Sequence, residues 1–429
     1  MANRLLGRLR EKNKKSGLFD KTSTHVAYPT GFLNFDYVNG YILQSRDMDD
    51  KLLGEFTNIG ISGGSFNTII GRSGSAKTTA AVQWSSAIVK PFDNAFVMHI
   101  DLEQSSNYTR IRNLTGFTNR ELEDHYILKQ EKCYLEDIFE MIMEVANEKE
   151  INKQDYIYSP PMTNEFGEKI ELYVPTVFIL DSIPSIVPKP ESKKDKESGV
   201  MLEQREVATG TEAMRNAKAL KNFYTQLMPI VKAYNIIIIA INHINSNVQI
   251  NPFDKKQPQL LYLKMDESLP GGSAPIYYAN NIFKFVSNDK TTIEKDGFSG
   301  FHVDIQLCKS RTAPAGQIST MVYDQNLGFD RARTLYNELD LNGMIGGSRN
   351  NAKYVKGSDD IKFNKLDFHN EFFSRPEVRK AVLDAAIPIF ENHMYRITNE
   401  DLYTQEFGIN MSVADSIFTV EGEDMRKAS

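Results

Sequence analysis

The stretch TIIGRSGSAKTTAAV, from Thr68 to Val82, decides the fold of this chain. An apolar run ends at Gly71, a loop of small and polar residues follows, and Lys77–Thr78 opens a segment of helical composition. This is close to the phosphate-binding pattern G-x-x-x-x-G-K-[ST], in which backbone N–H groups surround a phosphate at a helix N-terminus. It predicts a strand–loop–helix unit that binds a nucleoside triphosphate through Gly71, Arg72, Ser73, Gly74, Ser75, Ala76, Lys77, Thr78 and Thr79.

One residue departs from the pattern, because Ala76 stands where the second glycine is usual. We expect Ala76 to lie where the loop enters the helix, with a helical backbone. A methyl group costs little there, unlike at a position that needs a positive φ. The alternative is an ordinary strand-to-helix turn rich in Gly and Ser, so the other motifs of the chain decide between the two.

The order of apolar runs predicts the fold class. Thr176–Asp181 and Asn235–His243 are continuous apolar runs, typical of parallel strands that helices cover on both faces. A long helical segment, about 203–234, connects them as a crossover requires. Three later runs without helices between them, beginning after Asn280, predict an antiparallel extension of the sheet. We therefore expect an α/β core over 52–332, a basic N-terminal arm over 1–51 that docks on a neighbouring protomer, and an α-rich C-terminal domain over 333–429.

Composition limits the functional classes. The 429 residues are 41% hydrophobic and 25% charged, which is ordinary for a soluble protein, and no apolar run is long enough to cross a bilayer. The two cysteines, Cys133 and Cys308, lack metal-ligand spacing and indicate a reducing compartment such as the cytoplasm. The net charge of −6 argues mildly against nucleic-acid binding, but the basic segment Met1–Lys21 could bind phosphates or a neighbouring subunit.

Acidic residues follow two of the predicted strands. Asp101 and Glu103 come at the end of the strand after the Thr68–Val82 unit, where a carboxylate could polarise an attacking water. Asp181 ends the run VFILD and could hold the Mg²⁺ shell. Asp101 and Glu103 alone would also fit a solvated acidic turn.

Polar residues end two further strands. Asn242–His243 could sense a γ-phosphate and pass its presence to the next loop, although a lone histidine is more often structural. Lys309 and Arg311, two apart on a predicted strand, project together and could reach the nucleotide of another subunit; the alternative is an exposed basic strand edge. Two polar segments, Val187–Val200 and Ile244–Leu269, follow central strands at the edge where open α/β sheets bind ligands. Either could instead be a solvated surface loop.

In this order, the segments GRSGSAKTT, IDLEQSSNYTRIRNLTGF, FILDSIPSI, AINH, LPGGSAPIYYANNIFKF and KSRTAPAG resemble the core of RecA-type recombinases, in particular the branch found in T-even phages. The resemblance covers about 28–330. It implies a RecA-like ATPase fold with ATP and Mg²⁺ as cofactors. It also implies a homo-oligomeric helical filament on single-stranded DNA that pairs it with double-stranded DNA. Mediator and single-stranded-DNA-binding proteins would be its partners in the cytoplasm of a phage-infected cell.

The resemblance also assigns roles to single residues. Lys77 and Thr78 would contact phosphate and Mg²⁺, Asp181 would hold Mg²⁺ through water, Glu103 would be the catalytic base and His243 the γ-phosphate sensor. Lys309 and Arg311 would act across the filament interface. Asn107 and Arg110 would lie at the nucleotide, with Arg110 at the adenine-stacking position and Tyr108 two residues earlier. DNA would be bound by the two polar segments and their surroundings, through Lys193, Lys194, Arg205, Arg215, Asn245, Lys255, Lys256, Lys264, Gly271 and Gly272.

Two other classes remain open. A hexameric replicative helicase has a similar core and a similar K-x-R motif, but the long loop after AINH and the segment GGSAPIYYAN favour the recombinase. An ATP-binding scaffold or signalling ATPase without a DNA role would fit the acidic net charge.

Overall fold

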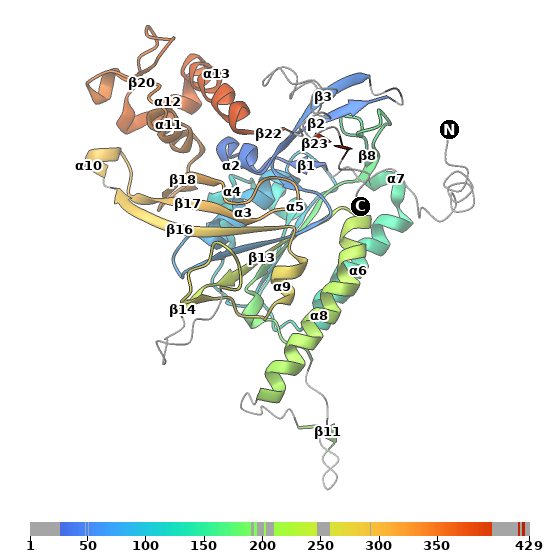
Figure 1. The fold of residues 1–429 in the computed structure, drawn as a ribbon. Coiled ribbons are helices and arrows are strands. Elements are labelled where there is room, and N and C mark those ends of the chain that lie inside the picture. Colours follow the sequence, from blue (N-terminus) through green and yellow to red (C-terminus); the bar gives the residue numbers. More distant parts are fainter. Residues whose placement is uncertain are drawn as a thin grey trace.

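The centre of the molecule is a nine-stranded mixed sheet with helices on both faces (Figure 1). It comes from a computed structural model that describes residues 26–47, 49, 51–189, 193–194, 201–202, 210–246, 258–291, 293–396, 419–420 and 423–424. Across the sheet the strands are β19 (Gly328–Phe329), β18 (Ile318–Asp324), β17 (Gly300–Lys309), β16 (Asn281–Thr291), β5 (Ser65–Gly71), β13 (Ile236–His243), β10 (Thr176–Asp181), β6 (Val97–Asp101) and β7 (Tyr126–Lys129).

The direction of the strands follows from the length of their connections. From β7 to β16 all neighbours are parallel. Most of these strands are joined by helices: α3 (Lys77–Val89), α4 (Tyr108–Thr115), α5 (Asn119–His125), α6 (Leu135–Ile151) and α8 (Gly210–Ala233). β17, β18 and β19 are antiparallel to their neighbours, because shorter connections join them. The prediction of a mostly parallel α/β sheet with an antiparallel extension is confirmed.

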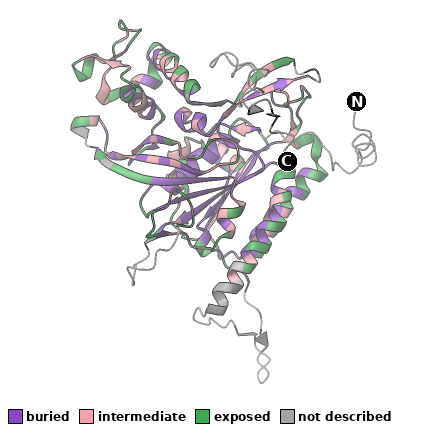
Figure 2. Ribbon diagram, in the orientation of Figure 1, coloured by how far each residue is buried: buried purple, intermediate pink, exposed green. Residues whose placement is uncertain are grey.

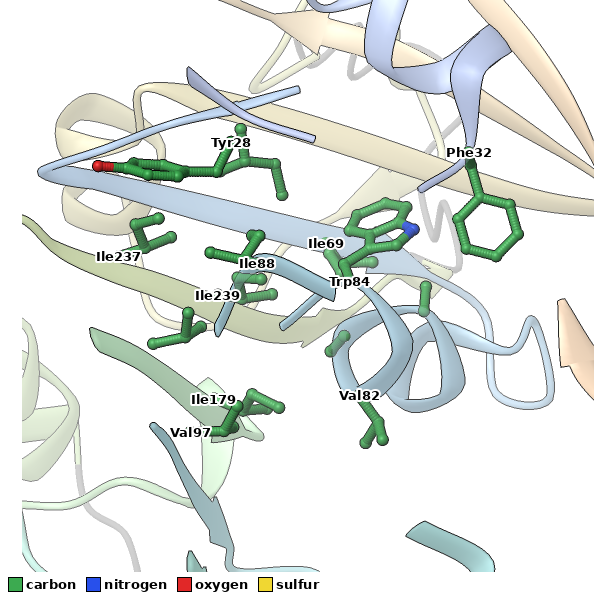
Figure 3. Packing of buried hydrophobic residues seen from close by; sticks show 14 of the residues in the cluster. Tyr28, Phe32, Ile69, Val82, Trp84, Ile88, Val97, Ile179, Ile237 and Ile239 are labelled. Carbon is green, nitrogen blue, oxygen red and sulfur yellow. The ribbon is translucent and has the colours of Figure 1, made fainter. Parts of the chain in front are cut away.

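Side chains of each central strand alternate between two hydrophobic clusters. On β13, Ile237 and Ile239 belong to the cluster beneath α3, whereas Ile236 and Ile238 belong to the cluster beneath α6 and α8. Figure 2 shows the sheet as the most buried part of the fold, and Figure 3 shows the α3 side, with Trp84 packed near Ile69. Because both faces are covered, these strands need apolar residues at every position. This explains why they appear in the sequence as uninterrupted apolar runs.

The N-terminal part of the described chain is integrated with the core. α2 (Leu33–Val38) places Phe35 against Trp84 at a ring-centroid distance of 4.2 Å. β1 (Ala27–Tyr28) pairs with β4 (Ile61–Ser62), and β2 (Tyr41–Arg46) pairs with β3 (Leu52–Asn58). The predicted boundary between residues 51 and 52 therefore falls inside the β2–β3 hairpin. The basic residues of Met1–Lys21 lie outside the described residues.

Helices dominate the described C-terminal part, which builds a third cluster from α11 (Arg331–Leu341), α12 (Phe368–Ser374) and α13 (Pro376–His393). The predicted boundary between residues 332 and 333 falls inside α11, and α13 contacts α2, so this part is continuous with the core. The smaller elements are α7 (Lys153–Tyr156), β8 (Ile157–Tyr158), β9 (Leu172–Tyr173), η1 (Ile183–Ser185), β11 (Lys193–Lys194), β12 (Met201–Leu202), β14 (Asn245–Ser246), β15 (Glu267–Ser268), α9 (Ala274–Tyr278), α10 (Ile293–Asp296), β20 (Ile345–Gly346), η2 (Asn350–Ala352), β21 (Tyr354–Val355), η3 (Lys365–Asp367), β22 (Tyr395–Arg396), β23 (Thr419–Val420) and β24 (Glu423–Asp424). Across the described ranges, none of the helices combines the length and apolarity that a bilayer crossing needs.

Candidate functional site

In the loop between β5 and α3, backbone carbonyls bind the side chain of Lys77. Lys77 is 6% exposed, and its Nζ donates hydrogen bonds to the carbonyls of Gly71 (3.1 Å) and Arg72 (2.8 Å). The Ser75 hydroxyl also donates to the Arg72 carbonyl at 2.8 Å. A Cβ on Gly71 would lie 2.7 Å from Ser75 Oγ and 2.9 Å from the Phe285 carbonyl oxygen, so only glycine fits there. Arg72, Ser73 and Gly74, by contrast, are exposed at the tip of the loop.

The expected backbone of Ala76 is wrong. Ala76 has φ +62° and ψ +25°, which is the left-handed region, and it occupies the N-cap position of α3. The helix itself begins at Lys77, as predicted. Alanine is therefore strained here by the contact between its Cβ and the backbone, which a glycine would avoid.

The ends of the central strands meet at one edge of the sheet. The β10–β6 register pairs Asp181 with Asp101, and the β13–β5 register pairs His243 with Gly71. Across this edge the Thr78 hydroxyl donates to Asp181 Oδ2 at 2.7 Å. Residues from four separate strand ends and from the start of α3 thus form one site, as their positions in the sequence predicted.

The site brings three carboxylates, those of Asp181, Glu103 and Asp101, close to one buried ammonium, that of Lys77. Burial raises the pKa of Asp181 to about 6; the Thr78 hydroxyl opposes this, and the carboxylates of Glu103 and Asp101 add to it. Burial lowers the pKa of Lys77, although Asp181 and Glu103 act in the opposite direction. A buried carboxylate next to other carboxylates favours a bound cation, and a hydroxyl and a carboxylate are the hard oxygen donors that Mg²⁺ prefers. The described residues contain no group of three or more His, Cys, Asp or Glu that could hold a metal by itself. Thr78 and Asp181 are therefore donors of the kind that Mg²⁺ prefers, and further ligands would be needed to complete its shell.

Glu103 forms a hydrogen-bonded network just beyond β6. Its Oε1 accepts from Ser182 Oγ at 2.7 Å and lies 3.0 Å from His243 Nε2. Burial alone would raise the pKa of Glu103, but the hydrogen bonds from Ser182 and His243 lower it below its ordinary value. The carboxylate is therefore ionised at neutral pH and held in one orientation. The sequence reasoning missed Ser182, whose only signal was its position directly after Asp181.

Asp101 has a structural role. Its Oδ2 accepts hydrogen bonds from the Ser106 backbone N–H at 2.8 Å and from Gln130 Nε2 at 2.9 Å, and its side chain is fully buried. Asp101 thereby fixes the turn that carries Glu103. Of the two acidic residues in HIDLE, Glu103 is the one that solvent reaches, since its side chain is 37% exposed and Asp101 is buried.

Asn107 and Arg110 both form hydrogen bonds within the chain. Asn107 caps α4 by accepting from the Arg110 backbone N–H at 2.8 Å. The Arg110 guanidinium donates to the Asn326 carbonyl at 3.0 Å and lies 3.4 Å from the Tyr323 hydroxyl. Tyr108 is 49% exposed, and its hydroxyl accepts from the Leu128 N–H at 3.2 Å. Arg110 thus has partners in the β18–β19 turn that limit its freedom to stack on a base.

The end of β13 is linked to the glycines near α9. Asn242 is 1% exposed, and its Nδ2 donates to the Pro270 carbonyl at 3.0 Å. Gly271 and Gly272 follow with φ of +90° and +73°, values that glycine adopts without strain. Asn242, the neighbour of His243, thus links the end of β13 to the segment that carries these glycines by one hydrogen bond.

Lys309 and Arg311 converge, but not as two residues of one strand. Lys309 is the last residue of β17, and Arg311 lies beyond the strand end, so the prediction was wrong on this point. Lys309 Nζ donates to the carbonyls of Ile276 (2.7 Å) and Tyr277 (2.9 Å), and Arg311 donates to the Tyr277 carbonyl at 3.2 Å. Burial, helped by the Arg311 charge, lowers the pKa of Lys309 to about 8.

This cation pair is remote from the Gly71–Thr78 loop of the same chain. Lys309 pairs with Ile282, and Ile282 pairs with Thr68 on β5. With about 3.3 Å per residue along a strand and about 4.8 Å between strands, its Cα lies roughly 14 Å from that of Gly71. Lys309 is level with the middle of β5, and both cations are hydrogen-bonded to carbonyls of α9.

The residues predicted to bind DNA are only partly described. Asn245 and Lys264 are exposed; Asn245 belongs to β14 and pairs with Ser268 of β15, and Lys264 precedes β15. Lys193 and Lys194 form β11, which pairs with β12, and Arg215 lies in α8. Arg205, Lys255 and Lys256 lie outside the described residues.

The sequence matches no model of a known protein family and no curated protein. The function of the chain is therefore inferred from the residues of this site and from their geometry.

Proposed function

We propose that this protein is an ATP-dependent DNA recombinase, which forms helical filaments on single-stranded DNA and promotes homologous pairing and strand exchange. One observation carries the proposal: Lys77, Thr78, Asp181, Glu103 and His243 lie together at the ends of the central strands, whereas Lys309 and Arg311 bind carbonyls of α9. Each copy of the chain would thus supply the loop and the acidic residues from one place and the two cations from another. A second copy of the chain would complete the site.

Each residue of the connected half can act on a triphosphate. The N–H groups of the loop and the Lys77 ammonium would bind phosphate oxygens, and the phosphate charge would favour the protonated form of the buried lysine. Thr78 and Asp181 would hold Mg²⁺, which supplies charge neutralisation for the phosphates when bound. Glu103 would orient a water and accept its proton, since it is ionised and is held by Ser182 and His243.

Lys309 and Arg311 would complete the site of the neighbouring copy. Two cations that approach the phosphates from another protomer stabilise the charge that develops during phosphoryl transfer. The carbonyls of Ile276 and Tyr277 orient both side chains in advance. ATP binding and assembly would then be linked equilibria, each strengthening the other.

The link to DNA would run through the end of β13. His243 Nε2 now contacts Glu103, and a γ-phosphate near it would compete for that contact; Asn242 would pass the resulting shift to Pro270 and the two glycines. The segments on both sides, around Asn245 and Lys264, would bind the DNA backbone and leave the bases free to pair.

The test is strand exchange and ATP hydrolysis by the full chain. We expect ATP turnover that single-stranded DNA stimulates, and exchange of strands between homologous molecules that requires ATP. A Lys77→Ala variant should lose both, because it cannot bind the phosphates. Turnover without any DNA dependence and without DNA binding would support a scaffold or signalling ATPase instead, and closed rings that unwind duplex DNA would support a helicase.

A further inference from the structure

Two opposite charges are buried together on the side of the sheet that carries the loop after β13. Lys284 on β16 and Glu267 on β15 form an ion pair with 2.7 Å between Nζ and Oε2, and their side chains are 8% and 4% exposed. Lysine and glutamate are almost never buried to this extent unless they are paired. Neither residue contacts the candidate site, so its chemistry does not explain them.

Both partners also bind the chain backbone between residues 262 and 267. Glu267 Oε2 accepts from the Lys264 N–H at 3.0 Å, and Lys284 Nζ donates to the Tyr262 carbonyl at 3.1 Å. Burial would raise the pKa of Glu267, but the Lys264 N–H and Lys284 lower it below its ordinary value. The short segment from Tyr262 to Glu267 is thus tied to β16 by ionised groups.

The position of the pair connects this segment with the candidate site. Lys284 is in register with Ile70 on β5, one residue before Gly71. Glu267 pairs with Ser246 across the β14–β15 ladder, and β14 follows the end of β13 at Asn242–His243. The ion pair therefore holds β15 against β16, at the level of the last residues of β5, the strand that leads into the Gly71–Thr78 loop.

The segment that is clamped has an unusual surface. Leu261 is 79% exposed and Met265 is 50% exposed, and Lys264 between them is exposed as well. On one short segment, Lys264 suits contact with phosphate, and the apolar Leu261 and Met265 suit contact with bases, as aliphatic side chains that insert between base steps do.

The energetics indicate a positioning role. A buried ion pair contributes little net stability compared with apolar residues of the same size, because both charges lose their hydration. What apolar residues cannot supply is the set of directed hydrogen bonds to Lys264 and Tyr262. We propose that Glu267 and Lys284 are positioning residues for single-stranded-DNA binding, which hold Leu261, Lys264 and Met265 in the arrangement that makes this binding depend on the bound nucleotide. The proposal rests on the recombinase function proposed above.

The test compares three variants of the full chain. Glu267→Leu/Lys284→Met removes the charges and keeps the volume. Glu267→Lys/Lys284→Glu keeps an ion pair but removes the acceptor for the Lys264 N–H and the donor to Tyr262. Glu267→Gln keeps an acceptor at the same place. Fluorescence anisotropy with a labelled oligo-dT measures affinity with a non-hydrolysable ATP analogue and with ADP, and calorimetry measures binding of the ATP analogue alone.

We expect all three variants to bind the ATP analogue as the wild type does. The ratio of DNA affinity with the ATP analogue to DNA affinity with ADP should be about tenfold or more smaller in the apolar and the reversed pair than in the wild type. A change of this size is within the usual range of coupling between sites. Glu267→Gln should keep most of this gain. Should the apolar pair fail to fold, the reversed pair, which retains a buried ion pair, carries the test.

Two results would overturn the proposal. If the apolar or the reversed pair folds, binds the ATP analogue and keeps the full gain in DNA affinity, the ion pair does not position a DNA-binding segment, while the recombinase function stands. If the wild type itself binds no oligo-dT with either nucleotide, the recombinase function fails and this proposal fails with it.

Discussion

Replacement of Asp181 with asparagine should stabilise the nucleotide-free protein at neutral pH. The side chain is almost fully buried, and burial raises its pKa to about 6. An aspartate in an unfolded chain has a pKa of about 3.9, so between these two values the folded state binds the proton more tightly than the unfolded state does. The stability that the protonated form contributes is fully present below about pH 4 and is lost as the pH rises through about 6.

The size of the effect follows from the difference between the two pKa values. Roughly 2 units at 1.36 kcal/mol per unit give about 3 kcal/mol in the free energy of unfolding, as an upper limit. Asparagine does not ionise, and its side-chain oxygen can still accept the hydrogen bond from the Thr78 hydroxyl, which is 2.7 Å long in the native protein. Near pH 4 the variant and the wild type should be equally stable, and above pH 7 the variant should be more stable.

Urea denaturation between pH 4 and 8, in EDTA and without nucleotide, measures this difference. Trp84, the single tryptophan and fully buried, reports unfolding by its fluorescence. Asp124→Asn is the matched control, because Asp124 is 54% exposed and lies 3.8 Å from Arg120 at the surface. Addition of Mg²⁺ and an ATP analogue should reverse the order, since only the wild type gains the stabilisation that a tightly bound ligand gives. A variant that is less stable than the wild type at pH 7.5 without nucleotide, or a difference that does not change with pH, would refute the reasoning.

Three further substitutions test other parts of the account. Ala76→Gly should raise the free energy of unfolding by up to about 1 kcal/mol in urea denaturation, since it relieves a left-handed alanine; a clear loss of stability would contradict the observed φ of +62°. Glu103→Gln should lower ATP turnover by about 10²- to 10⁴-fold in a phosphate-release assay and preserve DNA binding with ATP, whereas turnover within threefold of wild type would exclude Glu103 as the base. Burial lowers the pKa of Lys149 to about 7. Between about pH 7 and about pH 10 Lys149 is therefore protonated only in the unfolded state, so the free energy of unfolding of the wild type should rise with pH. Lys149→Met should remove this rise, and a rise that persists in the variant would assign it to other groups.

The fold could be predicted because its strands are buried on both faces. The run from Ile236 to Ala240 has no polar residue, so its length and its neighbours were enough to predict a central parallel strand. Its polar end at Asn242–His243 could be placed for the same reason, because parallel strands bring their carboxyl ends to one edge. The contact between Phe35 and Trp84 could not be predicted, since nothing in either segment signals a partner far away in the sequence.

Some details of the site could not be predicted, because they depend on backbone geometry that the residue types do not determine. The left-handed conformation of Ala76 is imposed by the closure of the loop on Lys77, and alanine gives no sign of it. The sequence also could not show that β17 ends before Arg311, because the Lys-x-Arg spacing fits a strand or a turn equally well. The ion pair of Glu267 and Lys284 joins two segments whose charges appear in the sequence as ordinary solvated residues.

The central claim is that the site is completed by a second copy of the chain on DNA. The most direct measurement is a cryo-electron-microscopy reconstruction of the full chain with single-stranded DNA, Mg²⁺ and a non-hydrolysable ATP analogue. The account predicts an open helical filament in which Lys309 and Arg311 of one protomer contact the γ-phosphate bound at Lys77 and Thr78 of the next. Protomers whose bound nucleotide faces solvent, with Lys309 and Arg311 distant from every phosphate, would contradict it.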